Sequence, residues 1–249
     1  IGDIAIIEIP KSLEAKEAII AEAVCKVHPN IKVVAKKEGP MEGEYRTRKI
    51  KVIYGEQRTE TEYRENGTRI LVDIAKVYFS PRLSFERKRI AGLVKDGENV
   101  LALFAGVGPF PLVIAKEHKK CNIVAIELNP EGARYMEKNI KLNKLVNVKV
   151  VLGDVNEVVP HVYQNWADRV IMPLPKDAEF FLKAAYVGAK DNATIHFYTF
   201  ANIKNPFGDA RKKAEAHLPA GKYHVIAERI VRPFSPSKVQ VVLDILVKK

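Results

Sequence analysis

Short strand-like stretches surround one amphipathic helix over the first third of the chain. Apolar residues recur at helical spacing over residues 12–27, where Ser12 is the expected N-cap and Glu14 and Glu17 lie near the positive helix end. The turn Glu65-Asn66-Gly67 is a hairpin signal. Strands are predicted at residues 4–9, 31–37, 48–55 and 68–76. We therefore expect residues 1–75 to form a small α+β domain.

From residue 82 onward the pattern changes to alternating helices and strands. Helices are predicted at residues 82–94, 109–118, 130–142, 177–188 and 207–217. Strands are predicted at residues 99–104, 122–127, 147–152, 168–173 and 193–200. Two last strands, 223–234 and 238–248, are joined by Ser235-Pro236-Ser237 with no helix between them. Residues 76–249 are therefore expected to form a mostly parallel, Rossmann-like sheet that ends in an antiparallel hairpin, an α/β fold.

Charge and composition narrow the class of partner. The chain of 249 residues carries a net charge of +11, which favours a polyanionic partner such as nucleic acid. A Lys/Glu-rich thermophile surface is the alternative. No apolar run reaches the ~20 residues of a membrane span, and no signal peptide is visible, so we expect a cytoplasmic protein. Cys25 and Cys121 are scattered and the histidines lack ligand spacing, so no metal is predicted.

A glycine-rich turn at residues 104–110 carries the first chemical signal. It joins a buried strand to a helix, and its glycines permit close approach of a ligand to the backbone. Pro109 suits the first turn of the following helix. The nicotinamide fingerprint would place a small residue at 111, where this chain has Pro111. That departure favours S-adenosylmethionine, which has no phosphate to cradle.

Two carboxylates follow at the ends of the next two strands. Glu127 lies about 20 residues after the glycines, where a carboxylate accepts hydrogen bonds from ribose hydroxyls. Asp154, within Gly153-Asp154-Val155, lies where an acidic residue commonly reads the adenine amino group. A tight turn with an exposed loop carboxylate is the structural alternative. The expected cofactor-binding residues are Phe104, Gly106, Gly108, Phe110, Glu127, Asp154 and Val155.

These features together carry a family resemblance. The terminal hairpin resembles the sheet of class I S-adenosylmethionine-dependent methyltransferases. Residues 73–87 and 104–110 resemble the archaeal and eukaryotic tRNA (guanine-37-N1)-methyltransferase family, and residues 42–48, 139–145 and 195–200 agree with it. The resemblance implies methyl transfer to the ring nitrogen of guanine-37, next to the anticodon. Family members carry a further N-terminal domain that helps to grip the tRNA, and we expect it to be missing before residue 1.

The resemblance also implies roles for three residues. Glu86 matches the family's general base, Arg46 matches an arginine that stabilises charge on the guanine carbonyl oxygen, and Tyr78 would pack near the flipped base. Each has a plainer alternative. Glu86 could be an ion-pair partner on a basic helix, Arg46 a phosphate contact and Tyr78 a core residue.

The fourth strand of the second unit departs from the family pattern. It runs into Pro173-Leu174-Pro175, where family members usually have Asn-Leu-Pro. Pro173 offers no side-chain donor or acceptor, so one base contact is lost and the pocket becomes more apolar. Ala102 likewise replaces an acidic residue that is common in the first strand. Either guanine remains the only target, or the chain resembles an archaeal branch that also methylates a carbon of the tricyclic 4-demethylwyosine precursor.

Two other functions compete with this hypothesis. One is the related aminocarboxypropyltransferase that acts on the wyosine precursor, and the other is a non-catalytic RNA-binding module. For the methyltransferase we expect a monomer that binds the anticodon stem-loop of tRNA, with Arg82 and Pro175 on the substrate side. The cations expected along the RNA backbone are Lys36, Lys37, Arg46, Arg48, Arg82, Arg87, Lys88 and Arg89.

Overall fold

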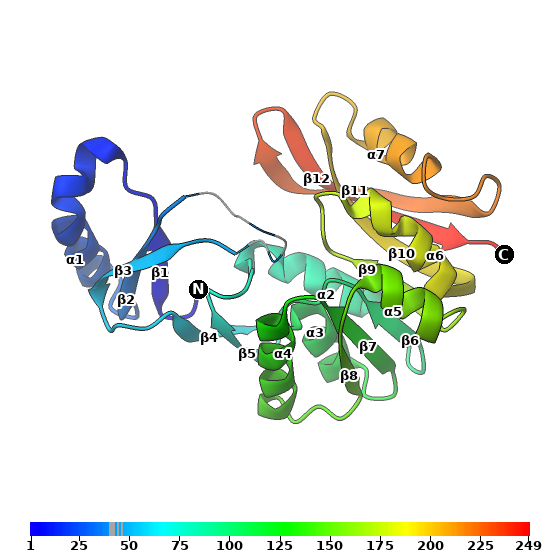
Figure 1. Cartoon of the computed structure of the whole chain (residues 1–249), viewed down its shortest axis with the longest axis horizontal. Coiled ribbons are helices and arrows are strands. Elements are labelled where there is room, and N and C mark those ends of the chain that lie inside the picture. The colour runs from blue at the N-terminus through cyan, green and yellow to red at the C-terminus, as the bar shows by residue number, and fades with distance from the viewer. Residues whose placement is uncertain (40–42, 44, 46) are drawn as a thin grey trace.

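The computed structural model describes residues 1–39, 43, 45 and 47–249, and it divides them among three sheets (Figure 1). The first sheet has the order β1-β2-β3, with β1 parallel to β2 and β2 antiparallel to β3. Its elements are β1 (Ile4–Ile7), η1 (Lys11–Lys16), α1 (Glu17–Val27), β2 (Val33–Lys37) and β3 (Ile50–Gly55). The helix predicted over residues 12–27 therefore starts as a 3-10 segment before it becomes α-helical.

A two-stranded hairpin follows, formed by β4 (Glu60–Glu65) and β5 (Thr68–Asp73). The expected turn is present, because Asn66 and Gly67 both have positive φ, of 45° and 71°. Strand β5 ends before residue 76 because the Asp73 carboxylate accepts the N–H of Ala75 at 3.0 Å and turns the chain.

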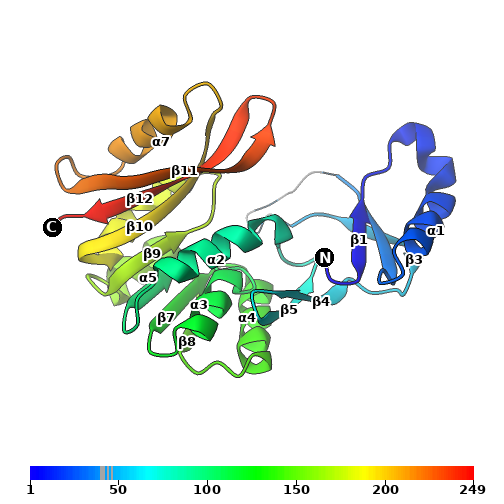
Figure 2. The same ribbon diagram turned by 180° about the vertical axis from the view of Figure 1, so that it is seen from behind.

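The hairpin lies between the N-terminal sheet and helices α3 (Pro109–Glu117) and α4 (Pro130–Leu142), as the view from behind shows (Figure 2). Ile70 and Val72 of β5 pack in one cluster with Leu112 of α3 and Tyr135 of α4. The hairpin thus shares its core with the second unit. The domain boundary at residue 75 stays a prediction.

The large sheet has seven strands in the order β11-β12-β10-β9-β6-β7-β8. Its strands are β6 (Asn99–Ala102), β7 (Asn122–Glu127), β8 (Val148–Leu152), β9 (Ala167–Met172), β10 (Ala189–Asn202), β11 (Tyr223–Ser235) and β12 (Lys238–Val247). Strands β6 to β10 are parallel, and β12 runs antiparallel to both β10 and β11. The predicted α/β fold, a Rossmann-like methyltransferase sheet with a terminal antiparallel hairpin, is confirmed.

Helices cover both faces of this sheet. One face carries α2 (Ser84–Leu93), α3 and α4, and the other carries the remaining helices. Those are α5 (Val155–Val162), α6 (Leu182–Gly188) and α7 (Pro206–Glu215), with 3-10 segments η2 (Pro81–Leu83) before α2 and η3 (Ala178–Phe181) before α6. Helix α5 was not predicted, because it is only 8 residues long and contains Pro160. No helix in the described part of the chain has the length and apolar character of a membrane span.

Candidate active site

A cavity of about 380 Å³ lies at the carboxyl ends of the parallel strands β6, β7, β8 and β9. Residues that follow each of these four strands line it, and Tyr78 reaches it from the segment before α2. Ligands of open α/β sheets bind at this edge, and the volume lies within the range of small-molecule sites. This cavity is therefore the candidate active site.

The glycine turn after β6 is shaped by three left-handed backbone conformations, at Phe104, Gly106 and Gly108. A Cβ on Gly108 would lie 2.8 Å from the Met136 side chain, so glycine is required there for packing as well as for φ. Phe104 and Gly106 line the cavity, and the Phe104 ring packs edge-on against Phe181 at 4.7 Å. The turn thus places bare backbone at the cavity wall.

Glu127, the last residue of β7, is held rigidly beside that turn. Its Oε2 accepts the N–H of Gly106 at 2.6 Å, and its Oε1 accepts the N–H of Asn129 at 2.8 Å. Burial raises the pKa of Glu127, while the backbone hydrogen bonds oppose that shift. Gly132 leaves room for the side chain, since a Cβ there would come within 3.0 Å of Glu127 Cγ.

Asp154 reaches the cavity from the turn after β8. It caps α5, and its carboxylate accepts the N–H of Asn156 at 2.7 Å. The residue is exposed and its neighbour Val155 is buried, and both line the cavity. A carboxylate oxygen that is not used for capping is available to a ligand.

The opposite rim consists of Tyr78 and Pro173-Leu174-Pro175 after β9. Tyr78 is 43% exposed, so it is a rim residue and not part of the core. The Pro175 carbonyl accepts the N–H of Phe200 at 3.0 Å, which ties this rim to β10. Most of the predicted cofactor and substrate residues therefore meet around one cavity.

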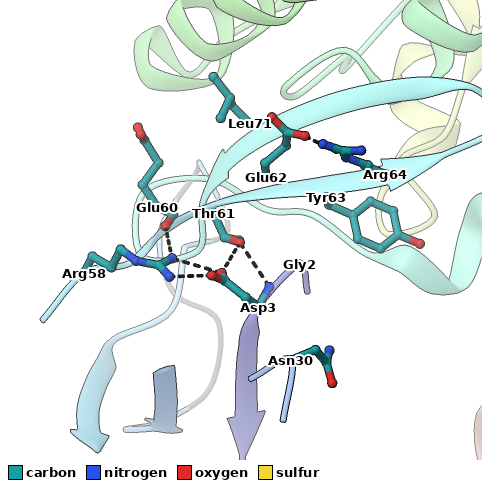
Figure 3. A pocket seen from close by; sticks show the side chains of 10 residues that line it. All are labelled: Gly2, Asp3, Asn30, Arg58, Glu60, Thr61, Glu62, Tyr63, Arg64 and Leu71. Carbon is teal, nitrogen blue, oxygen red and sulfur yellow. Dashed lines mark hydrogen bonds and ion pairs between the residues drawn. The ribbon is translucent and has the colours of Figure 1, made fainter. Parts of the chain in front are cut away.

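A second, larger hollow of about 670 Å³ lies between the N-terminal sheet and the β4–β5 hairpin (Figure 3). Its polar groups already pair with one another. Arg58 donates to both Asp3 oxygens at 3.0 and 2.5 Å, Thr61 donates to Asp3 at 2.7 Å, and the Arg58 hydrogen bonds lower the pKa of Asp3 to about 2. This cluster joins the N-terminal sheet to the β4–β5 hairpin.

Family comparisons agree with the geometry of the cavity. Residues 61–226 match the model of the TRM5/TYW2 methyltransferase domain, and residues 1–59 match that of the TYW2 N-terminal domain. The chain belongs to the TRM5/TYW2 methyltransferase family. The resemblance seen in the sequence is thereby confirmed.

Three curated relatives within the family differ in their named reactions. The chain is 43% identical to a tRNA (guanine(37)-N(1))-methyltransferase Trm5b of Pyrococcus abyssi, over 98% of this chain and 72% of the relative. It is 39% identical to the tRNA (guanine(37)-N(1))/4-demethylwyosine(37)-methyltransferase Taw22 of Nanoarchaeum equitans, over 82% and 84%. Identity is 31% to a tRNA(Phe) (4-demethylwyosine(37)-C(7)) aminocarboxypropyltransferase of Methanocaldococcus jannaschii, over 98% and 95%.

Solved structures of TRM5/TYW2 proteins superpose over the whole chain. Trm5b from Pyrococcus abyssi gives a TM-score of 0.88 at 41% identity, with 74% of that protein covered. A complex of aTrm5 with tRNALeu also gives 0.88, at 37% identity and 71% coverage. Trm5 of Methanocaldococcus jannaschii in complex with adenosine gives 0.85, at 37% identity and 73% coverage.

Four of the predicted site residues lie elsewhere than the cavity wall: Gly108, Phe110, Arg82 and Glu86. Gly108 is the N-cap residue of α3, and Phe110 is 4% exposed in the core, 6.1 Å from the Tyr198 ring. Arg82 is exposed in η2 and does not line the cavity. Arg46 lies outside the described residues.

Glu86 is buried in α2 and does not line the cavity either. Its Oε1 accepts the Tyr198 hydroxyl at 2.8 Å and Arg89 Nε at 2.7 Å. Burial, followed by the Glu86 charge, raises the pKa of Tyr198, so the phenol remains a donor. Glu86 Oε2 receives no hydrogen bond from the described part of the chain, and the Arg229 guanidinium lies 3.8 Å from it. One carboxylate oxygen is thus fixed by two hydrogen bonds, while among the described residues the other has only the ion pair with Arg229.

Glu86 and Tyr198 form one end of a buried polar network. Arg89 bridges Glu86 to Asp244, and Asp244 pairs with His196 at 2.6 Å. Burial lowers the pKa of His196 against the opposing effect of Asp244, so the ring is neutral; Nδ1 then donates to Asp244 while Nε2 accepts Arg169 at 2.8 Å. The network fixes α2 against the sheet.

The prediction that Arg87 contacts the RNA backbone is wrong. Its guanidinium is 2% exposed, pairs with the buried Glu65 carboxylate and donates to the Ser80 carbonyl at 3.2 Å. Other cations of that set are also engaged, since Lys36 pairs with Glu17 at 2.7 Å and Lys88 with Glu117 at 2.6 Å. The sequence shows where the cations lie along the chain, but it does not show which carboxylates pair with them in the fold.

Asn129 is a site residue that the sequence reasoning missed. Its side chain accepts the N–H of Glu131 at 3.0 Å as the N-cap of α4, and it donates to the Lys76 carbonyl at 3.0 Å. It therefore ties the segment that carries Tyr78 to the Glu127 turn. An Asn-Pro pair shortly after a strand is an N-cap signature that could have found it. Other missed lining residues are Tyr45, Val77, Leu128, Leu174, Lys176, Asp177 and Phe181.

Proposed function

We propose that this protein transfers a methyl group from S-adenosylmethionine to N1 of guanine-37 in tRNA. The observation that carries the proposal is the single cavity in which Glu127 and Asp154 face a rim formed by Tyr78 and residues 173–175. The named reactions of the relatives and the adenosine and tRNA complexes of similar structures support it.

The residues on the cofactor side fit an adenosine-bearing ligand. The Glu127 carboxylate, fixed by two backbone N–H groups, is placed to accept hydrogen bonds from the ribose hydroxyls. Asp154 is placed to accept from the adenine amino group, beside apolar Val155 and Phe104. When bound there, S-adenosylmethionine supplies an electrophilic methyl group.

The substrate side accommodates a base taken out of the RNA stack. Tyr78 offers an exposed aromatic ring, and Pro173 and Leu174 offer an apolar wall. Glu86 Oε2 is the proposed acceptor of the guanine N1 proton, with Tyr198 and Arg89 as positioning residues. Charge stabilisation by Arg46 belongs to the same proposal and rests on the family resemblance.

Pro173 favours a second substrate of the same enzyme, the 4-demethylwyosine base at position 37. An apolar wall suits a larger, flatter base, and one relative is named for both methylations. Replacing Pro173 by Asn restores an amide at the rim. We expect the P173N variant to lose methylation of the precursor while methylation of guanine is retained. Unchanged precursor methylation in that variant would contradict the role assigned to Pro173.

The proposed partner is the anticodon stem-loop of tRNA, bound by a monomer in the cytoplasm. Residues 1–75 would serve as an RNA-binding domain beside the catalytic domain at residues 76–249. Analytical ultracentrifugation with and without tRNA tests the oligomeric state, and a protein dimer in the complex would contradict it.

The decisive experiment is mass spectrometry of tRNA nucleosides after incubation with isotopically labelled S-adenosylmethionine. Guanine-bearing and precursor-bearing tRNA are assayed separately. A labelled methyl on guanine is the expected result. An aminocarboxypropyl group on the precursor would assign the chain to the other branch of the family, and no product with cofactor bound would point to an RNA-binding module.

A further inference from the structure

Aromatic and arginine side chains gather on one surface beside the cavity, at the same edge of the large sheet. We call this the aromatic–arginine surface. Phe85, the second residue of α2, is 67% exposed, and Phe234, near the end of β11, is 53% exposed. The surface consists of Phe85, Phe200, Arg229, Arg232 and Phe234.

Strand register places Phe200, Arg229 and Arg232 on the face of the sheet that α2 covers. Arg229 lies opposite Val242, which belongs to the buried cluster under α2, and Arg232 lies opposite Gln240 and donates to it at 2.9 Å. The N-terminus of α2 and the last residues of β11 both lie at the carboxyl edge of the parallel strands, because β11 runs parallel to β10. The same edge holds the cavity.

Direct contacts organise the surface into two aromatic platforms. The Arg229 guanidinium lies 5.1 Å from the centroid of the Phe85 ring. The Phe234 and Phe200 rings lie 3.9 Å apart at 31°, a nearly stacked pair. Phe200 donates its N–H to the Pro175 carbonyl on the cavity rim, so the second platform adjoins the site.

Single exposed apolar side chains are common and need no explanation. Here two exposed phenylalanines lie with arginines next to a cavity, in a chain of net charge +11. Aromatic faces with interspersed cations are the combination that binds unpaired nucleotides, through base stacking and phosphate contacts. An apolar protein partner would fit the rings but not the excess of positive charge.

We propose that the aromatic–arginine surface binds the unpaired nucleotides that flank the target base in the RNA. Their bases stack on Phe85 and Phe234, and Arg229 contacts a backbone phosphate of the same segment. Arg229 also lies 3.8 Å from Glu86 Oε2, so the surface adjoins the proposed general base. This inference rests on the proposed function and extends it to nucleotides that the enzyme does not modify.

The test measures tRNA binding by fluorescence anisotropy with two probes. One is a tRNA transcript with guanine at the target position, and the other carries an abasic nucleotide next to it. Phe85→Ala and Phe234→Ala are each expected to weaken binding of the first transcript roughly tenfold. Phe85→Tyr keeps a stacking face and is expected to bind like the unchanged protein.

Lys190→Ala is the matched control for Arg229→Ala. Lys190 lies at the start of β10, at the opposite edge of the sheet, and pairs with Asp168 at 2.8 Å. Loss of one charge there is expected to leave binding nearly unchanged, while the loss at Arg229 weakens it several-fold. Calorimetry with S-adenosylmethionine serves as the folding control, and its affinity is expected to be equal in all variants.

The abasic transcript separates stacking from other effects. It is expected to bind the unchanged protein more weakly and to show no further loss with one of the two variants, Phe85→Ala or Phe234→Ala, because the missing base and that ring belong to one contact, while the other variant still weakens binding. Equal affinity of the alanine variants and the unchanged protein for the first transcript would overturn the inference, including in favour of a protein partner. Absence of guanine methylation by the unchanged protein would instead overturn the proposed function, since the binding comparison does not depend on turnover.

Discussion

Glu127 illustrates how a single residue is prepared for ligand binding by its surroundings. Two backbone N–H groups fix its carboxylate at the cavity wall, and burial raises its pKa above the usual 4.5. The two effects act in opposite directions on the charge. The side chain is therefore well oriented but more easily protonated than an ordinary glutamate.

This balance predicts a pH dependence of cofactor affinity. The proposed ribose contacts require the ionised carboxylate, so S-adenosylmethionine binding weakens as pH falls through the raised pKa of Glu127. The loss is at most about tenfold per pH unit, as expected for one proton. Calorimetry across acidic to neutral pH measures this loss of affinity.

Two variants serve as controls. Glu127→Gln is expected to bind S-adenosylmethionine weakly and without this pH dependence, and Glu137→Gln, an exposed site on α4, is expected to behave like the unchanged protein. An inflection retained in Glu127→Gln would assign the titration to another group.

A second prediction at the residue scale concerns Glu86, whose two carboxylate oxygens have different surroundings. As the general base, it supplies about 10²-fold or more of the rate, so Glu86→Gln is expected to lower kcat by that amount. Tyr198→Phe removes one hydrogen bond to Oε1 and is expected to cost less activity and about 1 kcal/mol of unfolding free energy. Single-turnover rates and urea denaturation measure the two effects. If Glu86→Gln loses stability but keeps kcat within a few-fold of the unchanged enzyme, the residue is only an ion-pair partner.

Among the secondary-structure elements, α4 is attached to the β4–β5 hairpin through two asparagines one turn apart. Asn139 accepts the Leu71 N–H at 2.7 Å and donates to the carbonyls of Leu71 and Val107, each at 3.0 Å. Asn143 accepts the Arg69 N–H at 2.9 Å and donates to its carbonyl at 2.6 Å. The two amides act as a neighbouring strand would, and they cover the free edge of β5.

Removing one of these amides should destabilise the junction strongly. Asn139→Ala leaves one N–H and two carbonyls without this partner, which is expected to cost about 3 kcal/mol of unfolding free energy. Chemical denaturation measures the change, and Glu137→Ala on the exposed side of the same helix is the control, with an expected change below about 0.5 kcal/mol. A loss no larger than that of the control would show that water replaces the Asn139 contacts.

The elements that the sequence predicted best are those with a regular apolar pattern and clear end signals. Strand β7 and helix α4 have the predicted bounds, since a buried apolar run and an Asn-Pro start mark them. Strand β4, ETEYRE, was missed because charged residues dominate it and only Thr61 and Glu65 are buried. Its place in a sheet depends on the partner strand β5, which local patterning does not encode.

For the molecule as a whole, the sequence predicted which motifs meet but not which charges remain free. Strand ends in a parallel sheet share one edge, so Gly106, Glu127 and Asp154 were correctly expected to lie together. Arg87 and Glu65 are 22 positions apart and become a buried pair only through the packing of α2 on the hairpin turn. Arg82 and Arg87 are the same residue type in one short segment, but only Arg82 is exposed, and tertiary contacts decide this difference.

The last prediction concerns the salt dependence of tRNA binding, which depends on the cations that remain exposed. Arg82 is exposed in η2 and forms no ion pair with the described residues, so its charge is available to a phosphate. We expect affinity for tRNA to fall roughly 10²-fold between about 50 and 200 mM salt, because counterions are released on binding. Arg82→Ala is expected to reduce the slope of log affinity against log salt by about one, and Lys190→Ala to leave it unchanged. Filter binding across the salt range measures both slopes. Equal slopes for the two variants would remove Arg82 from the RNA contact, and a flat response of the unchanged protein would show that the net charge of +11 does not drive association.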